Sequence, residues 1–197
     1  MSRPAGQTPS QTVGPYFAYG LVPTQYGYDL RSLFDEELAT PQTPGQPIVI
    51  EGCVYDGAGA TIGDAMIEIQ QADSQGRRPT DPAAVAASGF RGFGRMGTGT
   101  LPGHAFRFRT VKPGATPDGQ APHVDVILTM RGMLVHAFTR IYFDDEPVAN
   151  AADPVLSQVP PERRQTLVAS RQPQAGAVVY RFDIRMQGDR ETVFFDV

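Results

Sequence analysis

Short segments of alternating apolar and polar residues, separated by glycine and proline, constrain this fold more than any other feature of the sequence. The 197 residues include 21 Gly and 18 Pro, and these turn residues are concentrated between the alternating segments. In residues 180–185, for example, Tyr, Phe and Ile alternate with Arg, Asp and Arg, which is the period of a half-buried strand. The pattern predicts an all-β fold: a β-sandwich with long loops, an N-terminal arm and one or two short helices.

The expected elements divide the chain into an arm and a domain. Residues 1–46 are expected to be an N-terminal arm and loop, with a helical turn near 28–38, that packs on a partner chain, and residues 47–197 to be the β-sandwich domain. A long loop is expected at 73–102, and a helix at 162–169 after Pro160-Pro161. The predicted strands are short: 48–55, 65–71, 106–111, 124–130, 134–143, 178–186 and 192–197.

Composition and charge argue against several classes of protein. Hydrophobic content is 41%, net charge is −4, and no cluster of basic residues suggests binding to nucleic acid or a membrane surface. No apolar run approaches the roughly 18 residues of a membrane span, and the polar N-terminus does not look like a secretory signal. The single cysteine, Cys53, excludes an intrachain disulfide and lies in an apolar strand, where a buried structural thiol is expected. A cytoplasmic location is therefore expected.

His123 and Asp125 are the first candidates for site chemistry. Residues two apart in a strand point to the same face, so the pair would place an imidazole beside a carboxylate, as two ligands of one metal do. Such pairs more often have a structural role. A metal enzyme would need a third ligand, and only His104 and His136 remain as imidazoles.

A longer pattern runs through residues 50–76. It consists of an apolar residue, a spacer and glycine, then a strand, a glycine turn, a second strand with an acid, and a final glycine: Ile50, Gly52, Val54, Gly59, Ile62, Ile67, Glu68, Ile69 and Gly76. Residues 110–114, Thr-Val-Lys-Pro-Gly, form a second stretch. Both resemble the intradiol ring-cleavage dioxygenases, which use a non-haem ferric ion to open catechol-type rings.

The resemblance implies four iron ligands, two tyrosines and two histidines, of which this chain keeps one residue type. The corresponding residues are Arg78, Thr116, His123 and Asp125. An arginine beside a trivalent cation is strongly unfavourable, and threonine is too short to replace a phenolate. The family's assisting arginine corresponds to Gln120. These positions are interpreted as a vestigial metal site without metal, in which Arg78 pairs with Asp125.

Further stretches resemble the iron-free subunits of two-chain members of this family. They lie at residues 8–17, 131–132, 139–146 and 180–197. The resemblance implies an αβ hetero-oligomer in which a homologous β chain binds Fe(III), with 3,4-dihydroxybenzoate and O2 as substrates. This chain would be inactive alone and would shape the substrate pocket at the interface. The implied substrate-binding residues are Arg131, Thr12, Gly14, Pro15 and Tyr16.

Arg131 fits this role chemically, because a guanidinium recognises a carboxylate through two hydrogen bonds. The structural alternative is a turn arginine in a surface ion pair. For the whole chain, the alternatives are a stand-alone β-sandwich binding module with a degenerate metal site, and a metal enzyme built on His123, Asp125 and another imidazole.

Overall fold

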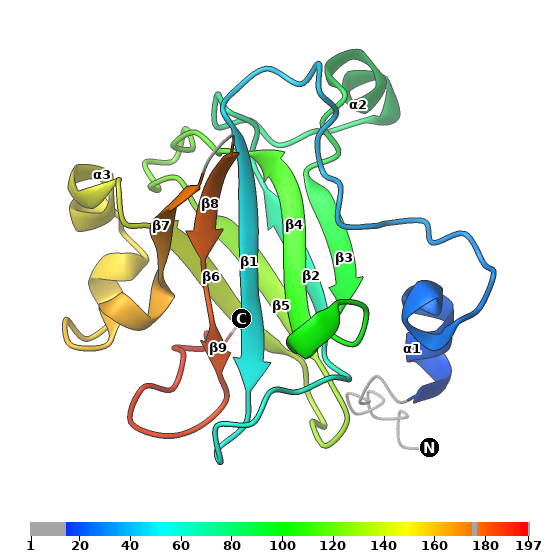
Figure 1. The fold of residues 1–197 in the computed structure, drawn as a ribbon. Helices are drawn as coiled ribbons and strands as arrows, with labels where there is room; N and C mark the ends of the chain where they lie inside the picture. The colour runs from blue at the N-terminus through cyan, green and yellow to red at the C-terminus, as the bar shows by residue number, and fades with distance from the viewer. Residues whose placement is uncertain (1–14, 175–176, 197) are drawn as a thin grey trace, which may run out of the picture.

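The computed structural model describes residues 15–174 and 177–196, and nine strands carry most of the fold in this part of the chain (Figure 1). The strands are hydrogen-bonded in the order β3-β2-β5-β6-β7-β8-β1-β4, and β9 pairs with β1. Their bounds are β1 Pro47–Tyr55, β2 Met66–Gln71, β3 Phe93–Gly97, β4 Ala105–Val111, β5 Val124–Thr129, β6 Ala137–Phe143, β7 Val168–Gln174, β8 Ala177–Arg181 and β9 Ile184–Arg185.

Short helices lie between the strands. The α-helices are α1 Pro15–Leu21, α2 Pro82–Ser88 and α3 Pro147–Ala152, and the 3-10 helices are η1 Pro23–Tyr26, η2 Pro102–His104, η3 Leu156–Gln158 and η4 Arg164–Leu167. No helix in the described part of the chain is long and apolar enough to cross a membrane.

The sheet curls so that its two halves face each other. Figure 1 shows β8, β1 and β4 in front of β6, β5 and β2, and β7 joins the halves by pairing with both β8 and β6. The core between them includes Ile50, Ile67, Phe108 and Leu128, all fully buried. Each such side chain stabilises the fold by about 1.5–3 kcal/mol relative to an exposed one.

Residues 35–39, the closing segment, lie between the two edge strands. On one side, the Leu38 N–H donates to the Arg109 carbonyl of β4 at 2.9 Å. On the other side, the Arg95 N–H of β3 donates to the Asp35 carbonyl at 3.0 Å. Leu38 itself is fully buried in the core. The closing segment therefore covers backbone groups that edge strands would otherwise expose.

Two glycines of the 50–76 pattern permit close backbone contacts. A Cβ at Gly52 in β1 would lie 1.7 Å from the Phe182 carbonyl oxygen. Gly76 has φ +78°, and its Cβ would lie 1.9 Å from the Ala115 carbonyl oxygen. At these positions the pattern reflects backbone packing, because only glycine lacks the Cβ that would clash.

Lys112, the only lysine in the sequence, connects the end of β4 to the turn after β6. Its Nζ lies 2.9 Å from Asp145 Oδ1 and 2.7 Å from Glu146 Oε1, and its side chain is 13% exposed. Burial would lower the pKa of Lys112, but the hydrogen bonds to Glu146 and Asp145 outweigh it and raise the pKa. The Tyr180 hydroxyl donates to Asp145 at 2.8 Å, and burial together with this hydrogen bond raises the pKa of Tyr180 to about 12.

The expectation of a mainly β-sheet protein with few helices is confirmed. The strands predicted at 48–55, 65–71, 106–111 and 124–130 are present as β1, β2, β4 and β5. The predicted number of helices is wrong, because the described residues contain three α-helices and four 3-10 helices. The predicted loop 73–102 contains α2 and β3.

Three local predictions are wrong. Residues 162–169 form η4 and the start of β7 instead of an α-helix, because Val168 and Ala169 pair with β6. Residues 192–196 make only an isolated bridge, between Phe195 and Phe138, and residue 197 lies outside the described residues. The helical turn expected near 28–38 is absent there, and η1 precedes that region.

Candidate functional site

Asp125 is the centre of the cluster formed by the predicted metal-site positions. Its Oδ2 accepts a hydrogen bond from Arg78 Nη2 at 2.6 Å, and its Oδ1 lies 3.0 Å from Arg140 Nε. Asp125 is directly opposite Arg140 in the antiparallel β5–β6 pairing, so the sheet itself brings these charges together. The hypothesis that Arg78 pairs with Asp125 is confirmed.

His123 lies beside this ion pair as a neutral imidazole. The ring is buried, and Nδ1 donates to the Ala121 carbonyl at 2.7 Å. Nε2 is buried without a hydrogen-bond partner, 3.7 Å from Asp125 Oδ1. Burial lowers the pKa of His123, more than the Ala121 carbonyl and Asp125 raise it, and the nearby Arg140 and Arg78 lower it further. The predicted pairing of imidazole and carboxylate is therefore present, but both groups face guanidinium charges.

Thr116 and Gln120 lie in the loop that leads to His123. The Thr116 hydroxyl donates to Asp118, so it is directed to its own turn. Gln120 Oε1 accepts from Arg140 Nη1 at 2.6 Å and thereby fixes the second cation of the cluster. The structure thus brings Arg78, His123 and Asp125 together, with Gln120 linked to them through Arg140.

This donor set does not fit a ferric ion. Arg78 brings a positive charge to one of the predicted ligand positions, and the Asp125 carboxylate already lies within 3.0 Å of two guanidinium groups. His104 Nδ1 lies 3.0 Å from the Thr61 hydroxyl, and the ring of His136 packs against Phe138. Within residues 15–174 and 177–196, no three His, Cys, Asp or Glu side chains are grouped to hold a metal ion.

We expect His123→Asn to reduce the loss of stability on acidification. The unfolded His123 binds a proton near pH 6.5, whereas the folded pKa is lower. The neutral imidazole therefore contributes stability that is present above about pH 6.5 and is lost as pH falls toward the folded pKa. Asparagine keeps an N–H for the Ala121 carbonyl and does not titrate. Between about pH 7.5 and about pH 5, the urea midpoint should decrease more for the parent chain than for His123→Asn. Equal decreases would contradict the assignment of this loss of stability to His123.

Arg131 lies at another corner of the molecule, in the turn after β5. Its Nε donates to Asp64 in the bend before β2. The two residues line a cavity of 340 Å³ together with Gly63 and with residues of α1 and η1: Ala18, Tyr19, Gln25 and Tyr26. Tyr19 packs edge-on against Tyr26, with ring centroids 4.5 Å apart. The arginine predicted to bind substrate is therefore combined with aromatic side chains from the N-terminal segment.

The predicted N-terminal pocket residues are only partly within the described structure. Thr12 and Gly14 lie outside the described residues, and Pro15 and Tyr16 form the start of α1. The segments next to this corner expose large apolar side chains: Phe17, Tyr28, Leu30 and Leu33 after the N-terminus, and Leu134 and Val135 after Arg131. Exposed apolar side chains near one site are typical of a surface that contacts another protein.

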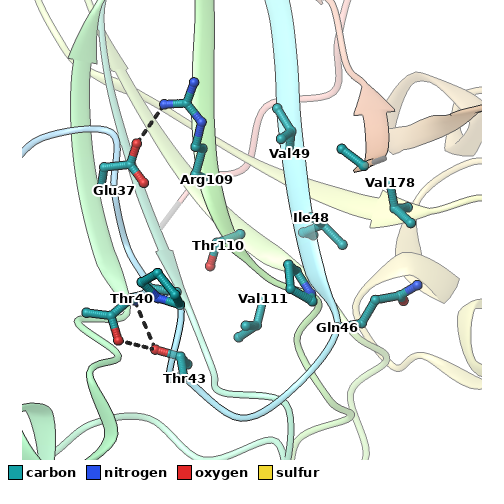
Figure 2. A pocket seen from close by; sticks show the side chains of 14 residues that line it. Glu37, Thr40, Thr43, Gln46, Ile48, Val49, Arg109, Thr110, Val111 and Val178 are labelled. Carbon is teal, nitrogen blue, oxygen red and sulfur yellow. Dashed lines mark hydrogen bonds and ion pairs between the residues drawn. The ribbon is translucent and has the colours of Figure 1, made fainter. Parts of the chain in front are cut away.

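Two further cavities lie elsewhere on the sheet. The cavity in Figure 2, of 540 Å³, lies over β1 and β4, and aliphatic side chains such as Ile48, Val111 and Val178 line much of it. Its ionic groups, Glu37 and Arg109, pair with each other at 2.6 Å. A cavity of 480 Å³ next to Asp125 and Arg140 is lined mainly by strand residues, with polar and apolar side chains in similar numbers and with Phe93, Phe138 and Phe195 among them.

The similarity to known proteins agrees with this geometry. A family model described as Dioxygenase matches residues 13–188. The protocatechuate 3,4-dioxygenase alpha chain of Burkholderia cepacia is 60% identical over 97% of this chain and 98% of its own length. The chain belongs to the dioxygenase family that includes these alpha chains. The alpha chain of Pseudomonas putida is 43% identical over 96% of both chains.

A more distant relative and two solved structures are also similar. The protocatechuate 3,4-dioxygenase beta chain of B. cepacia is 29% identical over 73% of this chain and 66% of its own length. The dioxygenase domain of a carbohydrate-binding fusion protein from Streptomyces sp. SirexAA-E superposes with a TM-score of 0.61 at 24% identity, covering 95% of this chain and all of that domain. An intradiol ring-cleavage dioxygenase from Tetranychus urticae gives 0.62 at 16% identity, over 92% and 94% of the two chains.

Sequence reasoning missed two residues that organise these sites. Arg140 holds Asp125, and Asp64 holds Arg131. The signal that would have found them is strand register. Asp125 is opposite Arg140 in the β5–β6 pairing, and the β2–β5 register, extended two residues beyond Met66 and Thr129, places Asp64 opposite Arg131.

Proposed function

We propose that this chain is the iron-free alpha subunit of a protocatechuate 3,4-dioxygenase. The observation that carries the proposal is the Arg78–Asp125 ion pair, at two positions where the family resemblance implies iron ligands, in a chain 60% identical to such an alpha chain. A partner chain with an intact ligand set would then bind the Fe(III). The similarity to a beta chain supports a homologous partner in an αβ hetero-oligomer.

In this proposal, the N-terminal segment and the Arg131 corner face the partner's active site. Residues 1–46 pack on the beta chain, and Thr12, Gly14, Pro15 and Tyr16 line the substrate pocket. The exposed side chains Phe17, Leu33 and Leu134 support a protein contact in this region. The domain of residues 47–197 is the scaffold, and its two facing layers support describing it as a β-sandwich.

The complex would convert 3,4-dihydroxybenzoate and O2 to 3-carboxy-cis,cis-muconate, a reaction of aromatic catabolism in the β-ketoadipate pathway. Both oxygen atoms enter the product, and the bond between the two hydroxylated carbons breaks. The partner's iron would supply the activation of the catecholate toward O2. Arg131 would contact the substrate carboxylate, because an exposed guanidinium beside aromatic side chains fits an aromatic acid. This chain would thereby orient the ring.

Co-expression with a candidate beta chain tests this function. We expect the chain purified alone to be colourless, iron-free and inactive, and the complex to contain iron, absorb visible light and consume one O2 per 3,4-dihydroxybenzoate. The beta chain alone is the control for the contribution of this subunit. Iron and activity in this chain alone would refute the proposal. A stable monomer that does not bind the beta chain would favour a stand-alone binding module.

A further inference from the structure

The Asp64–Arg131 contact joins a firmly held backbone segment to an exposed turn. The backbone of residues 62–65 is fixed by Thr98, a fully buried residue whose hydroxyl donates to the Ile62 carbonyl at 2.7 Å and accepts from the Ala65 N–H at 3.1 Å. Arg131 lies in a turn in which residues 131, 132 and 134–136 are all exposed. The position of the guanidinium thus depends on an anchor outside its own turn.

The contact leaves part of the guanidinium available. Asp64 accepts from Nε, and the Arg131 side chain remains 68% exposed. A guanidinium carries five N–H donors, and its two terminal nitrogens together match the two oxygens of a carboxylate. An aspartate that holds Nε therefore restricts the plane of the group and leaves the two terminal nitrogens for another acceptor, at a residue that lines the cavity shared with Tyr19 and Tyr26.

We propose that Asp64 is a positioning residue for substrate carboxylate recognition, acting through Arg131; this inference rests on the proposed function. Asp64 does not touch the substrate. It holds Arg131 in a conformation that presents Nη1 and Nη2 to the carboxylate, so that little side-chain freedom remains to be lost on binding. Immobilising a flexible side chain weakens binding by about two- to thirteen-fold at an interface, and Asp64 removes that cost in advance.

The test compares Asp64→Ala, Asp64→Asn and Arg131→Ala in the purified complex with the beta chain. KM and kcat are measured for 3,4-dihydroxybenzoate and for catechol, which lacks the carboxylate. Asp64→Ala should raise KM for the acid by about three- to ten-fold, leave kcat unchanged and leave catechol unaffected. Asp64→Asn keeps an oxygen acceptor for Nε and should stay within about two-fold of the parent. Arg131→Ala should raise KM for the acid by about thirty-fold.

Glu51→Ala is the matched control. Glu51 pairs with Arg107 at 3.0 Å, and its side chain is 27% exposed, close to the 25% of Asp64. The Glu51→Ala variant should leave KM and kcat unchanged for both substrates.

The outcomes separate the two proposals. If Arg131→Ala raises KM for the acid but not for catechol, and Asp64→Ala does not, the positioning role of Asp64 is refuted and the proposed function stands. Equal losses in Asp64→Ala and Asp64→Asn would also refute positioning, because they would show that only the charge matters. If Arg131→Ala affects both substrates equally, the carboxylate contact is wrong and the role of Asp64 fails with it. Sedimentation of each variant verifies that the complex is intact.

Discussion

Replacing Asp153 with alanine should destabilise the chain by about 4 kcal/mol. The carboxylate is fully buried and accepts hydrogen bonds from the Ala121, Val155 and Leu156 N–H groups at 2.7–2.9 Å, and from the Tyr142 hydroxyl at 3.1 Å. Alanine would leave these buried donors unsatisfied, each at a cost of about 1–3 kcal/mol. The free energy of unfolding, measured by urea titration with circular dichroism, gives the result directly.

Asp153→Asn is the matched variant. Its amide oxygen can still accept from two of the donors, but its NH2 group opposes the remaining N–H, so we expect about half the loss of the alanine variant. Because Asp153 holds the backbone at Ala121, the alanine variant should also disturb the His123 ring that bonds to that residue. A loss below about 1 kcal/mol for Asp153→Ala would contradict this account.

Gly52→Ala should cost at least about 3 kcal/mol or prevent folding. The added Cβ would lie 1.7 Å from the Phe182 carbonyl oxygen and 2.8 Å from Phe106 Cζ. β1 cannot move away, because it is hydrogen-bonded to β4 and β8 on its two sides. The yield of folded protein and the urea midpoint measure the effect.

Gly20→Ala is the control for this substitution. Gly20 lies in α1, and a Cβ there meets nothing within 4 Å. Alanine in a helix is favoured over glycine by about 1 kcal/mol, so this variant should be as stable as the parent or slightly more stable. Similar losses at both glycines would mean that close approach to Phe182 is not the cause at Gly52.

Local patterns predicted the parts of the structure that depend on local chemistry. Alternation located most strands, and the resemblance to the ligand pattern assigned Arg78 and Asp125 to one site, where their opposite charges predicted an ion pair. Arg140 and Asp64 were missed because their contacts depend on which strands pair and in which register. Single-sequence alternation shows the face of a residue but not its neighbour across the sheet.

Other differences arise from competition between local and tertiary preferences. β3 contains Gly94 and Gly97, which weaken a strand signal, yet β2 and the closing segment hold it from both sides. The region of α2 was expected to be a loop, although its sequence contains two helix-capping signals. Asp81 accepts from the Ala84 N–H at 2.8 Å at the start of the helix, and Gly89 ends the helix with φ 67°.

The Lys112 network also determines how the protein can be labelled. Acylating reagents attack neutral amines, and the only ε-amine of the chain is held as a cation by Asp145 and Glu146. An α-amino group, with a pKa near 7.7–8.0, is far more often neutral at about pH 7. An amine-directed dye should therefore react much more slowly with Lys112 than with an exposed neutral amine while the protein is folded, and should reach Lys112 readily only after unfolding.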